Sequence, residues 1–227
     1  MSLKNAGNLV LIGAGKMGGA MLEGWLARGY PPGRIYIQDP GATDDLRALS
    51  ADKGIHLNVS LTDIPDAEVV LLAVKPQIMD GVLQGLGALL RSNTVFLSIA
   101  AGKTIKGMAA GLVSASVGDI SPAIVRSIPN TPAAVGRGIT VACANSRVSE
   151  SQKDLCTNLL AAIGEVAWVD DESLIDAVTA VSGSGPAYGF YLTECLARAG
   201  VAVGLSIPFS LLFLCSPFSS PASSFSL

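Results

Sequence analysis

The hydrophobic pattern of the first 28 residues predicts a strand, a glycine turn and a helix. Four apolar residues, Leu9 to Ile12, lead directly into Gly13-Ala14-Gly15-Lys16-Met17-Gly18. Apolar residues then recur at helical spacing up to Gly29, which favours the end of a helix (Met21, Leu22, Trp25 and Leu26). A GxGxxG dinucleotide fingerprint requires this order of elements.

The three glycines of this turn have separate physical tasks. Gly13 permits a tight turn, Gly15 lets the backbone approach a pyrophosphate, and Gly18 lets the helix pack closely on its strand. The free N–H groups at the start of the helix also favour a bound phosphate. We therefore expect dinucleotide binding by the whole turn, which comprises Gly13, Ala14, Gly15, Lys16, Met17 and Gly18.

The pattern further along the chain alternates between strands and helices. Residues 68–74 (EVVLLAV) form an uninterrupted apolar run, which is typical of a central parallel strand covered on both faces. Further strands are expected at 34–39, 94–99, 123–127, 139–144 and 165–169, and helices at 44–53, 78–90 and 149–163. The alternation predicts a doubly wound α/β domain over residues 1–170, with a parallel sheet and short β-elements at its later edge.

Asp39 follows the second predicted strand, about 20 residues after the glycine turn, where an acid hydrogen-bonds the adenine-ribose hydroxyls. A carboxylate there would disfavour a 2′-phosphate, since like charges ~4 Å apart repel by up to ~4 kcal/mol at an effective dielectric of ~20. Asp39 therefore favours NADH, although Lys16 or a loop arginine could reverse the preference. The structural alternative is a turn carboxylate in Asp-Pro-Gly.

Other candidate residues follow the ends of predicted strands, where ligands bind in such sheets. Lys75 and Pro76 follow the 68–74 strand, and a solvated lysine is the alternative there. Ala100-Ala101-Gly102 suits a flat ring lying against backbone, or equally tight packing. The loop Pro129-Asn130-Thr131-Pro132 is expected to be extended and stiff, with Asn130 as either a ligand-facing amide or a turn former.

Beyond Asp170 the composition changes. A helix is expected at 174–181, an interruption at Ser182-Gly183-Ser184-Gly185-Pro186, and a second helix at 187–203, with Pro186 in its first turn. The interruption suggests an interface or a site. The tail, 206–227, holds eight serines, three prolines and four of the six phenylalanines, and no charged residue follows Arg198. This tail is unlike a domain terminus, and we expect an out-of-frame or alternatively terminated end.

The composition excludes several classes of function. A net charge of −3 with 15% charged residues gives no nucleic-acid surface. No run reaches about 18 apolar residues, so no membrane span or signal peptide is expected. The four cysteines lack metal-type spacing and accompany one histidine, which indicates reduced thiols in a cytoplasmic protein without a metal site.

Together these motifs resemble the pyrroline-5-carboxylate reductases, which catalyse the last step of proline biosynthesis. The matching stretches occur in the family's order over roughly residues 8–205: IGAGKMGGAM, LAVKPQ, SIAAG, RSIPNTPAAVGRGIT and LIDAVTAVSGSGPAYGFYLTECLARAGVAVGL. GxGxxG is shared with many dehydrogenases, whereas the combination with AVKP, PNTPA and SGSGPAY is far more specific.

The resemblance implies hydride transfer from NADPH or NADH to the cyclic imine 1-pyrroline-5-carboxylate, giving L-proline. It implies no catalytic acid or base. Gly13 to Gly18 would hold the pyrophosphate, and the nicotinamide would lie between Ala73, Val74, Lys75 and Pro76 on one side and Ala100 and Ala101 on the other. The substrate side would comprise Asn130, Glu172, Ser184 and Gly185. Glu172 could pair with the protonated ring nitrogen, or act only as an acid at a helix N-terminus.

The resemblance also implies a Rossmann-like domain followed by an all-helical domain for substrate binding and homo-oligomerisation, which begins here at 171–205. Family members continue with helices that carry a Ser-Pro-Gly-Gly-Thr-Thr motif and build the dimer, and residues 206–227 show none of this. We therefore expect an incomplete helical domain and a compromised dimer. The alternative function is a catalytically impaired form that only binds the dinucleotide. A β-hydroxyacid dehydrogenase would need a lysine that residues 174–204 lack.

Overall fold

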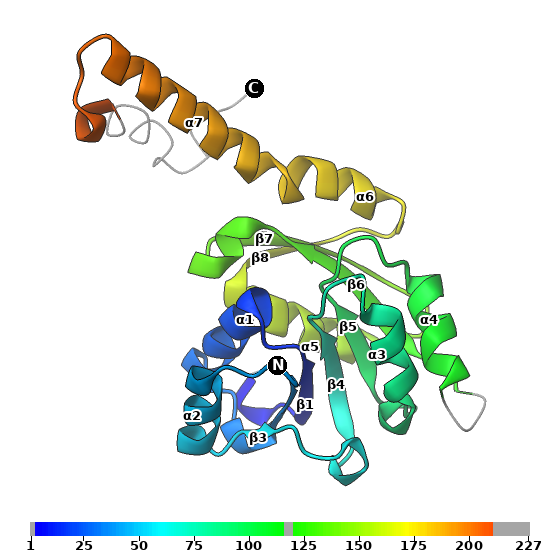
Figure 1. Ribbon diagram of the computed structural model, residues 1–227. Helices are drawn as coiled ribbons and strands as arrows, with labels where there is room; N and C mark the ends of the chain where they lie inside the picture. Colours follow the sequence, from blue (N-terminus) through cyan, green and yellow to red (C-terminus); the bar gives the residue numbers. More distant parts are fainter. Residues whose placement is uncertain (1–2, 116–119, 211–227) are drawn as a thin grey trace. The chain divides into compact units, whose positions relative to one another are not determined.

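The computed structural model describes residues 3–115 and 120–210, which fall into two compact units (Figure 1). The first unit ends at Gly183 and the second begins at Ser184.

The first unit is built on one eight-stranded sheet with the order β3-β2-β1-β4-β5-β6-β7-β8. The strands are β1 (Asn8–Ile12), β2 (Ile35–Gln38), β3 (His56–Leu57), β4 (Ala67–Leu72), β5 (Val95–Ser98), β6 (Ala123–Pro129), β7 (Gly138–Ala144) and β8 (Gly164–Trp168). Central β1 is parallel to both β2 and β4, with Val10 opposite Tyr36 on one side and Val70 on the other. The strand order reverses beside β1, which confirms the predicted doubly wound α/β fold.

The later edge of the sheet differs from the predicted all-parallel arrangement. β7 is antiparallel to β6, with Ile128 opposite Val141, and β8 is parallel to β7. The physical reason is the short connection from β6 to β7, which a parallel crossover could not span. The connection holds a 3-10 helix, η5 (Thr131–Val135), so the expectation of an extended loop at Pro129-Asn130-Thr131-Pro132 was wrong after Asn130.

The helices of the first unit are α1 (Lys16–Ala27), α2 (Asp44–Lys53), α3 (Met79–Gly85), α4 (Ile105–Ser114), α5 (Glu150–Leu160) and α6 (Leu174–Val178). The helix expected at 78–90 is instead α3 followed by a separate 3-10 helix, η4 (Gly87–Leu89). The sequence pattern had not indicated α4, in which two glycines weaken the helical propensity (IKGMAAGLVS). Thr104 caps α4 by accepting a hydrogen bond from the Gly107 amide.

Alternate side chains of the central strands enter two separate hydrophobic cores. Leu9 and Leu11 lie in the core beneath α1 and α5, whereas Val10 and Ile12 lie in the core beneath α3 and α4. Both sets are buried, which explains why the 68–74 run is apolar without alternation. The buried Trp25 indole on α1 donates to the Leu159 carbonyl on α5 at 2.9 Å and so joins the two helices of the first core.

The second unit contains the long helix α7 (Gly185–Ala202), with Pro186 in its first turn as expected. Many of its large apolar side chains are exposed, among them Tyr188, Phe190, Tyr191 and Leu192. A groove of about 580 Å³ lies along α7, with Phe190, Ala197, Val201 and Ile207 among its lining residues. Within residues 3–115 and 120–210, no helix is long and apolar enough to cross a membrane.

Candidate active site

The turn after β1 is tightly packed. Gly13 has a φ of +89°, and its amide donates to the Gln38 carbonyl at 2.9 Å. A Cβ at Gly13 would lie 2.9 Å from the Val74 side chain and 3.0 Å from the Ala73 carbonyl oxygen. A Cβ at Gly18 would overlap the Gly13 carbonyl oxygen. Both positions therefore require glycine for packing within the protein.

Gly15 is constrained in a different way. A Cβ there would meet no protein atom within 4 Å, because Gly15 is exposed at the start of α1. No side chain caps α1 at Gly15, and its first turn contains no acidic residue. Free N–H groups with a positive dipole end and an open approach suit a pyrophosphate, which a Cβ at Gly15 would obstruct. The turn thus fits a bound dinucleotide.

Asp39 closes the same turn from β2. Its Oδ2 accepts a hydrogen bond from the Ala14 amide at 2.8 Å, and its Oδ1 accepts one from the Gly41 amide at 2.9 Å. The contact with Gly41 is the turn carboxylate that the sequence left open as an alternative. The Ala14 amide is directed at Asp39, so Gly15 and the following residues present the remaining amides of the turn.

The carboxyl ends of β1, β4 and β5 are aligned beside this turn and are joined by backbone hydrogen bonds. The Ala73 amide donates to Ile12 O at 2.8 Å, and the Ile99 amide donates to Leu72 O at 3.1 Å. Ala73 and Val74 therefore contact the glycine turn directly, while Lys75 and Ala101 are exposed and Ala100 is buried. This edge brings together the residues expected to hold the two halves of a dinucleotide.

An ion pair that the sequence did not predict lies next to this edge. Lys103, in the loop after β5, places its Nζ 2.8 Å from both carboxylate oxygens of Asp80 in α3. The lysine side chain is one-quarter exposed and the aspartate is mostly exposed. The pair connects the Ala100-Ala101-Gly102 loop to the start of α3.

Asn130 follows β6 and is largely buried. Its Oδ1 accepts a hydrogen bond from the Ile139 amide at 3.0 Å, which closes the η5 connection. Its Nδ2 donates to Ser182 Oγ at 3.4 Å. Ser182 belongs to a π-helix, Thr179–Gly183, which continues α6 where the sequence predicted an interruption. Single π-turns of this kind are frequent at functional sites.

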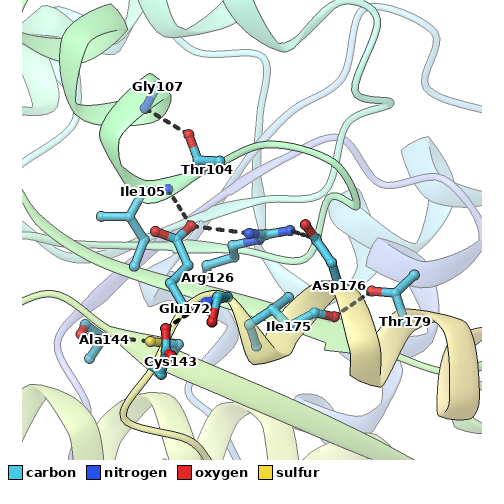
Figure 2. Close-up of polar contacts among 12 residues, drawn as sticks. Thr104, Ile105, Gly107, Arg126, Cys143, Ala144, Glu172, Ile175, Asp176 and Thr179 are labelled. Atoms are coloured by element: carbon cyan, nitrogen blue, oxygen red, sulfur yellow. Dashed lines mark hydrogen bonds and ion pairs between the residues drawn. The ribbon is translucent and has the colours of Figure 1, made fainter.

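Arg126 on β6 forms the most buried charged contact of the described residues (Figure 2). The guanidinium is only 2% exposed, and its Nη1 and Nη2 lie 3.1 Å from Glu172 Oε1 and 2.6 Å from Asp176 Oδ1. A buried charge is tolerated only when it is paired in this way. An arginine inside the apolar strand 123–127 was the sequence signal for this cluster, and the sequence reasoning missed it.

Glu172 joins three elements through one carboxylate oxygen. Oε1 accepts from the Ile105 amide at 2.7 Å as well as from Arg126, so it satisfies a free N–H group at the start of α4 (Figure 2). Asp176 lies one helical turn later, on α6. Glu172 and Arg126 therefore attach α6 to β6 and α4, and the partners of Glu172 in the structure are a guanidinium and a backbone amide.

Ser184 and Gly185 begin the second unit and lie at the N-terminus of α7. The Ser184 carbonyl accepts a hydrogen bond from the Ala187 amide at 3.0 Å. The first unit thus contains Asn130 and Glu172 of the expected substrate residues, and the second contains Ser184 and Gly185.

The buried cysteines are poor candidates for nucleophiles. Burial raises the pKa of the Cys156 thiol to about 12. Burial, followed by the Glu172 carboxylate, also raises the pKa of Cys143 above its ordinary value. Both thiols are therefore protonated at neutral pH. The single histidine, His56, stacks on Tyr36 with ring centroids 4.4 Å apart in the β2–β3 pair.

The family models and the relatives that match this chain point to the same family of enzymes. Residues 8–102 match a family model described as NADP oxidoreductase, coenzyme F420-dependent, and residues 172–215 match one described as pyrroline-5-carboxylate reductase dimerisation. The pyrroline-5-carboxylate reductase of Pseudomonas aeruginosa is 41% identical over 199 residues, covering 87% of this chain and 70% of the relative. The Escherichia coli enzyme is 36% identical over 196 residues, covering 86% and 70%.

Solved structures of pyrroline-5-carboxylate reductases also align with this chain. The pyrroline-5-carboxylate reductase of Coxiella burnetii aligns with a TM-score of 0.82 at 34% identity, covering 94% of this chain and 77% of that one. The Plasmodium falciparum pyrroline carboxylate reductase, solved with NADP bound, aligns with a TM-score of 0.77 at 26% identity, covering 95% and 76%.

The two glycines of the turn give separable predictions. We expect Gly15→Ala to leave stability nearly unchanged but to weaken binding of NADH and NADPH by roughly tenfold or more, since one hydrogen bond to a charged group contributes about 1.5–3 kcal/mol. Gly18→Ala should instead lower the free energy of unfolding by about 1–3 kcal/mol through overpacking. Calorimetric titration and urea unfolding measure the two effects. Full affinity in Gly15→Ala would contradict the assignment of the turn.

The Arg126 cluster predicts unequal effects for its two acids. Glu172→Ala should lower the free energy of unfolding by about 3 kcal/mol, because it leaves a buried guanidinium with one partner and an uncapped α4 amide. Asp176 is 77% exposed, so Asp176→Ala should cost less than about 1 kcal/mol. Urea unfolding of both variants tests this order, and equal losses would show that Asp176 stabilises the guanidinium as much as Glu172 does.

Proposed function

This chain belongs to the pyrroline-5-carboxylate reductase family, and from that membership we propose how its residues perform the reaction. It is an NAD(P)H-dependent oxidoreductase that reduces 1-pyrroline-5-carboxylate to L-proline, the last step of proline biosynthesis. The observation that carries this conclusion is the 41% identity to a pyrroline-5-carboxylate reductase over 87% of the chain. Nothing in the described residues favours a chain that only binds the dinucleotide.

We propose that the cofactor binds along the ends of β1, β4 and β5. The Gly13–Gly18 turn and Asp39 would hold the pyrophosphate and the adenine ribose. Ala73, Val74, Lys75 and Pro76 would line one side of the nicotinamide, and Ala100 and Ala101 the other. Support comes from the hydrogen-bonded strand ends at Ala73 and Ile99 and from the open approach to Gly15.

The proposed reaction needs no ionisable side chain as a catalytic acid, base or nucleophile. The protonated cyclic imine is already electrophilic at its C=N carbon, and the reduced nicotinamide supplies the hydride. The residues of the chain orient the two rings and exclude water, and such positioning contributes roughly 7–11 kcal/mol. The raised pKa values of Cys143 and Cys156 agree with a site that uses no thiolate.

We propose that the substrate side comprises Asn130, Glu172, Ser184 and Gly185. Asn130 would position the π-helix through Ser182, to which its Nδ2 donates at 3.4 Å. Glu172 would act as a positioning residue, because its carboxylate is paired with Arg126 and with the Ile105 amide. On this proposal no carboxylate of the first unit needs to contact the iminium nitrogen directly.

We also propose a domain organisation and a location. Residues 1–170 would form the dinucleotide domain, 171–205 the start of the helical domain, and 206–227 an atypical tail; the match of residues 172–215 to the dimerisation family supports the first boundary. A cytoplasmic location is proposed from the cysteine pattern, in which the described thiols are free.

The test of the function is loss of reduced-cofactor absorbance when the purified 227-residue chain meets pyrroline-5-carboxylate. We expect turnover, and Asn130→Ala should lower kcat by about 100-fold, because a shift of about 1 Å in a positioning loop has this effect. Asn145→Ala is the matched control. Its amide makes equivalent contacts at the start of β6, with the Ile124 amide and the Pro122 carbonyl.

Equal losses of turnover in Asn130→Ala and Asn145→Ala would assign Asn130 a purely structural role. A folded chain that binds either cofactor but turns over no imine would contradict the proposed function for this chain.

Residues 172–215 match the family's dimerisation domain, so homo-oligomerisation is indicated. We propose that α7 supplies the contact through its exposed apolar side chains, and that the association is weaker than in the relatives. Sedimentation velocity should show dissociation at micromolar concentration, and Tyr191→Glu should give monomer. Val135→Glu, at a side chain equally exposed on η5, is the control. Monomer at every concentration, or no effect of Tyr191→Glu, would overturn the proposal.

A further inference from the structure

The carboxylate of Asp39 is held in one place by the protein itself. Its two oxygens accept from the Ala14 amide at 2.8 Å and the Gly41 amide at 2.9 Å. Ala14 is the second residue of the glycine turn, so the carboxylate lies directly against the segment that would hold the pyrophosphate. A side chain with both oxygens engaged in this way does not rotate to accommodate a ligand.

The backbone of Asp39 is fixed by a second set of contacts. Its amide donates to Asn58 Oδ1 at 2.8 Å, and its carbonyl accepts from Asn58 Nδ2 at 2.9 Å. Asn58 has a φ of +53°, the one positive value at a non-glycine residue in the described chain. Its amide also donates to Ile37 O at 2.8 Å, which anchors the pair to β2. Asn58 thus positions Asp39.

The charges around Asp39 are unfavourable for another anion. Asp44 and Asp45 occupy the first turn of α2, a few residues further along the chain. The sequence left Lys16 and a loop arginine as cations that could reverse the preference; Lys16, Arg34 and Arg47 are all exposed. Among residues 3–115 and 120–210, none of the three forms an ion pair with Asp39. No described ion pair therefore compensates this carboxylate.

This geometry distinguishes the two nicotinamide cofactors, and the inference rests on the cofactor site proposed above. A carboxylate has about four acceptor positions, of which the two backbone amides use two, so hydroxyl donors of an adenine ribose can still be accepted. A 2′-phosphate at the same place would bring a second anion against a fixed carboxylate. We propose that Asp39, held by Asn58 and Ala14, makes this chain select NADH over NADPH.

The test is calorimetric titration of the purified chain with NADH and with NADPH, followed by the same titrations of variants. We expect NADH to bind about tenfold more tightly or better, since that ratio corresponds to only about 1.4 kcal/mol of repulsion between partly screened charges. The ratio should fall as salt rises. Asp39→Asn should move it towards NADPH by about tenfold. Asp52→Asn is the matched control, because it removes the same charge from the far end of α2, where Asp52 pairs with Lys53.

A second variant keeps the side chain of Asp39 and its hydrogen bonds. At Gly41 a Cβ would lie 3.5 Å from Asp39 Oδ1, an ordinary contact, and the backbone there has no positive φ. Gly41→Arg therefore adds a cation beside Asp39 and should also shift the ratio towards NADPH. This result supports the proposal even if Asp39→Asn fails to fold.

The remaining outcomes overturn the proposal or its premise. Equal or tighter binding of NADPH by the unmodified chain would overturn it. So would an equal loss of both affinities in Asp39→Asn together with no shift in Gly41→Arg, since that would assign Asp39 only to the turn. Binding of neither cofactor would contradict the proposed cofactor site, whereas loss of imine turnover with NADH binding retained would contradict only the reaction.

Discussion

The arrangement of the turn after β1, and of the strand ends beside it, depends on how closely the backbone of α1 approaches the backbone of β1. A single methyl group at Gly18 would overlap the Gly13 carbonyl, and one at Gly13 would press on Ala73 and Val74. Because the approach is this close, one short glycine turn connects β1 to α1, and the first amides of α1 open towards the edge of the sheet. Asp39 can then reach Ala14 from the neighbouring strand. The turn after β1 is therefore shaped mainly by backbone contacts.

The opposite half of the first unit is organised by a side chain. Arg126 lies inside the sheet and is stabilised by Glu172, just before α6, and by Asp176 in α6. The same Glu172 oxygen accepts from the first amide of α4. A buried guanidinium imposes strict geometry, because any displacement of its partners leaves a charge without compensation. The start of α6, and with it the π-helix that contacts Asn130, is positioned by charge pairing and not by apolar packing alone.

Much of the fold could be predicted because strong local patterns agree with one another. The apolar run at 68–74 and the glycine turn each have a direct physical reading, and the doubly wound sheet follows from them. The antiparallel direction of β7 could not be predicted, because the periodicity of hydrophobic residues is the same in parallel and antiparallel strands. α4 was not predicted, because its two glycines weaken the helical signal of its sequence. The Arg126 cluster was missed because its partners lie 46 and 50 residues away.

The partners of Glu172 in the structure bear on which of its two predicted roles this residue has. The motif alone left two roles for this acid, pairing with an iminium or stabilising a helix start. In the structure its carboxylate serves a helix start and a buried cation together. An electrophile that is already protonated has no need of a further acid, so the protein can use its carboxylates to hold elements in place. Asp39 does this beside the glycine turn through backbone amides, and Glu172 does it at the far side of the sheet edge through Arg126. Both carboxylates therefore fix the geometry of the backbone or the elements around them.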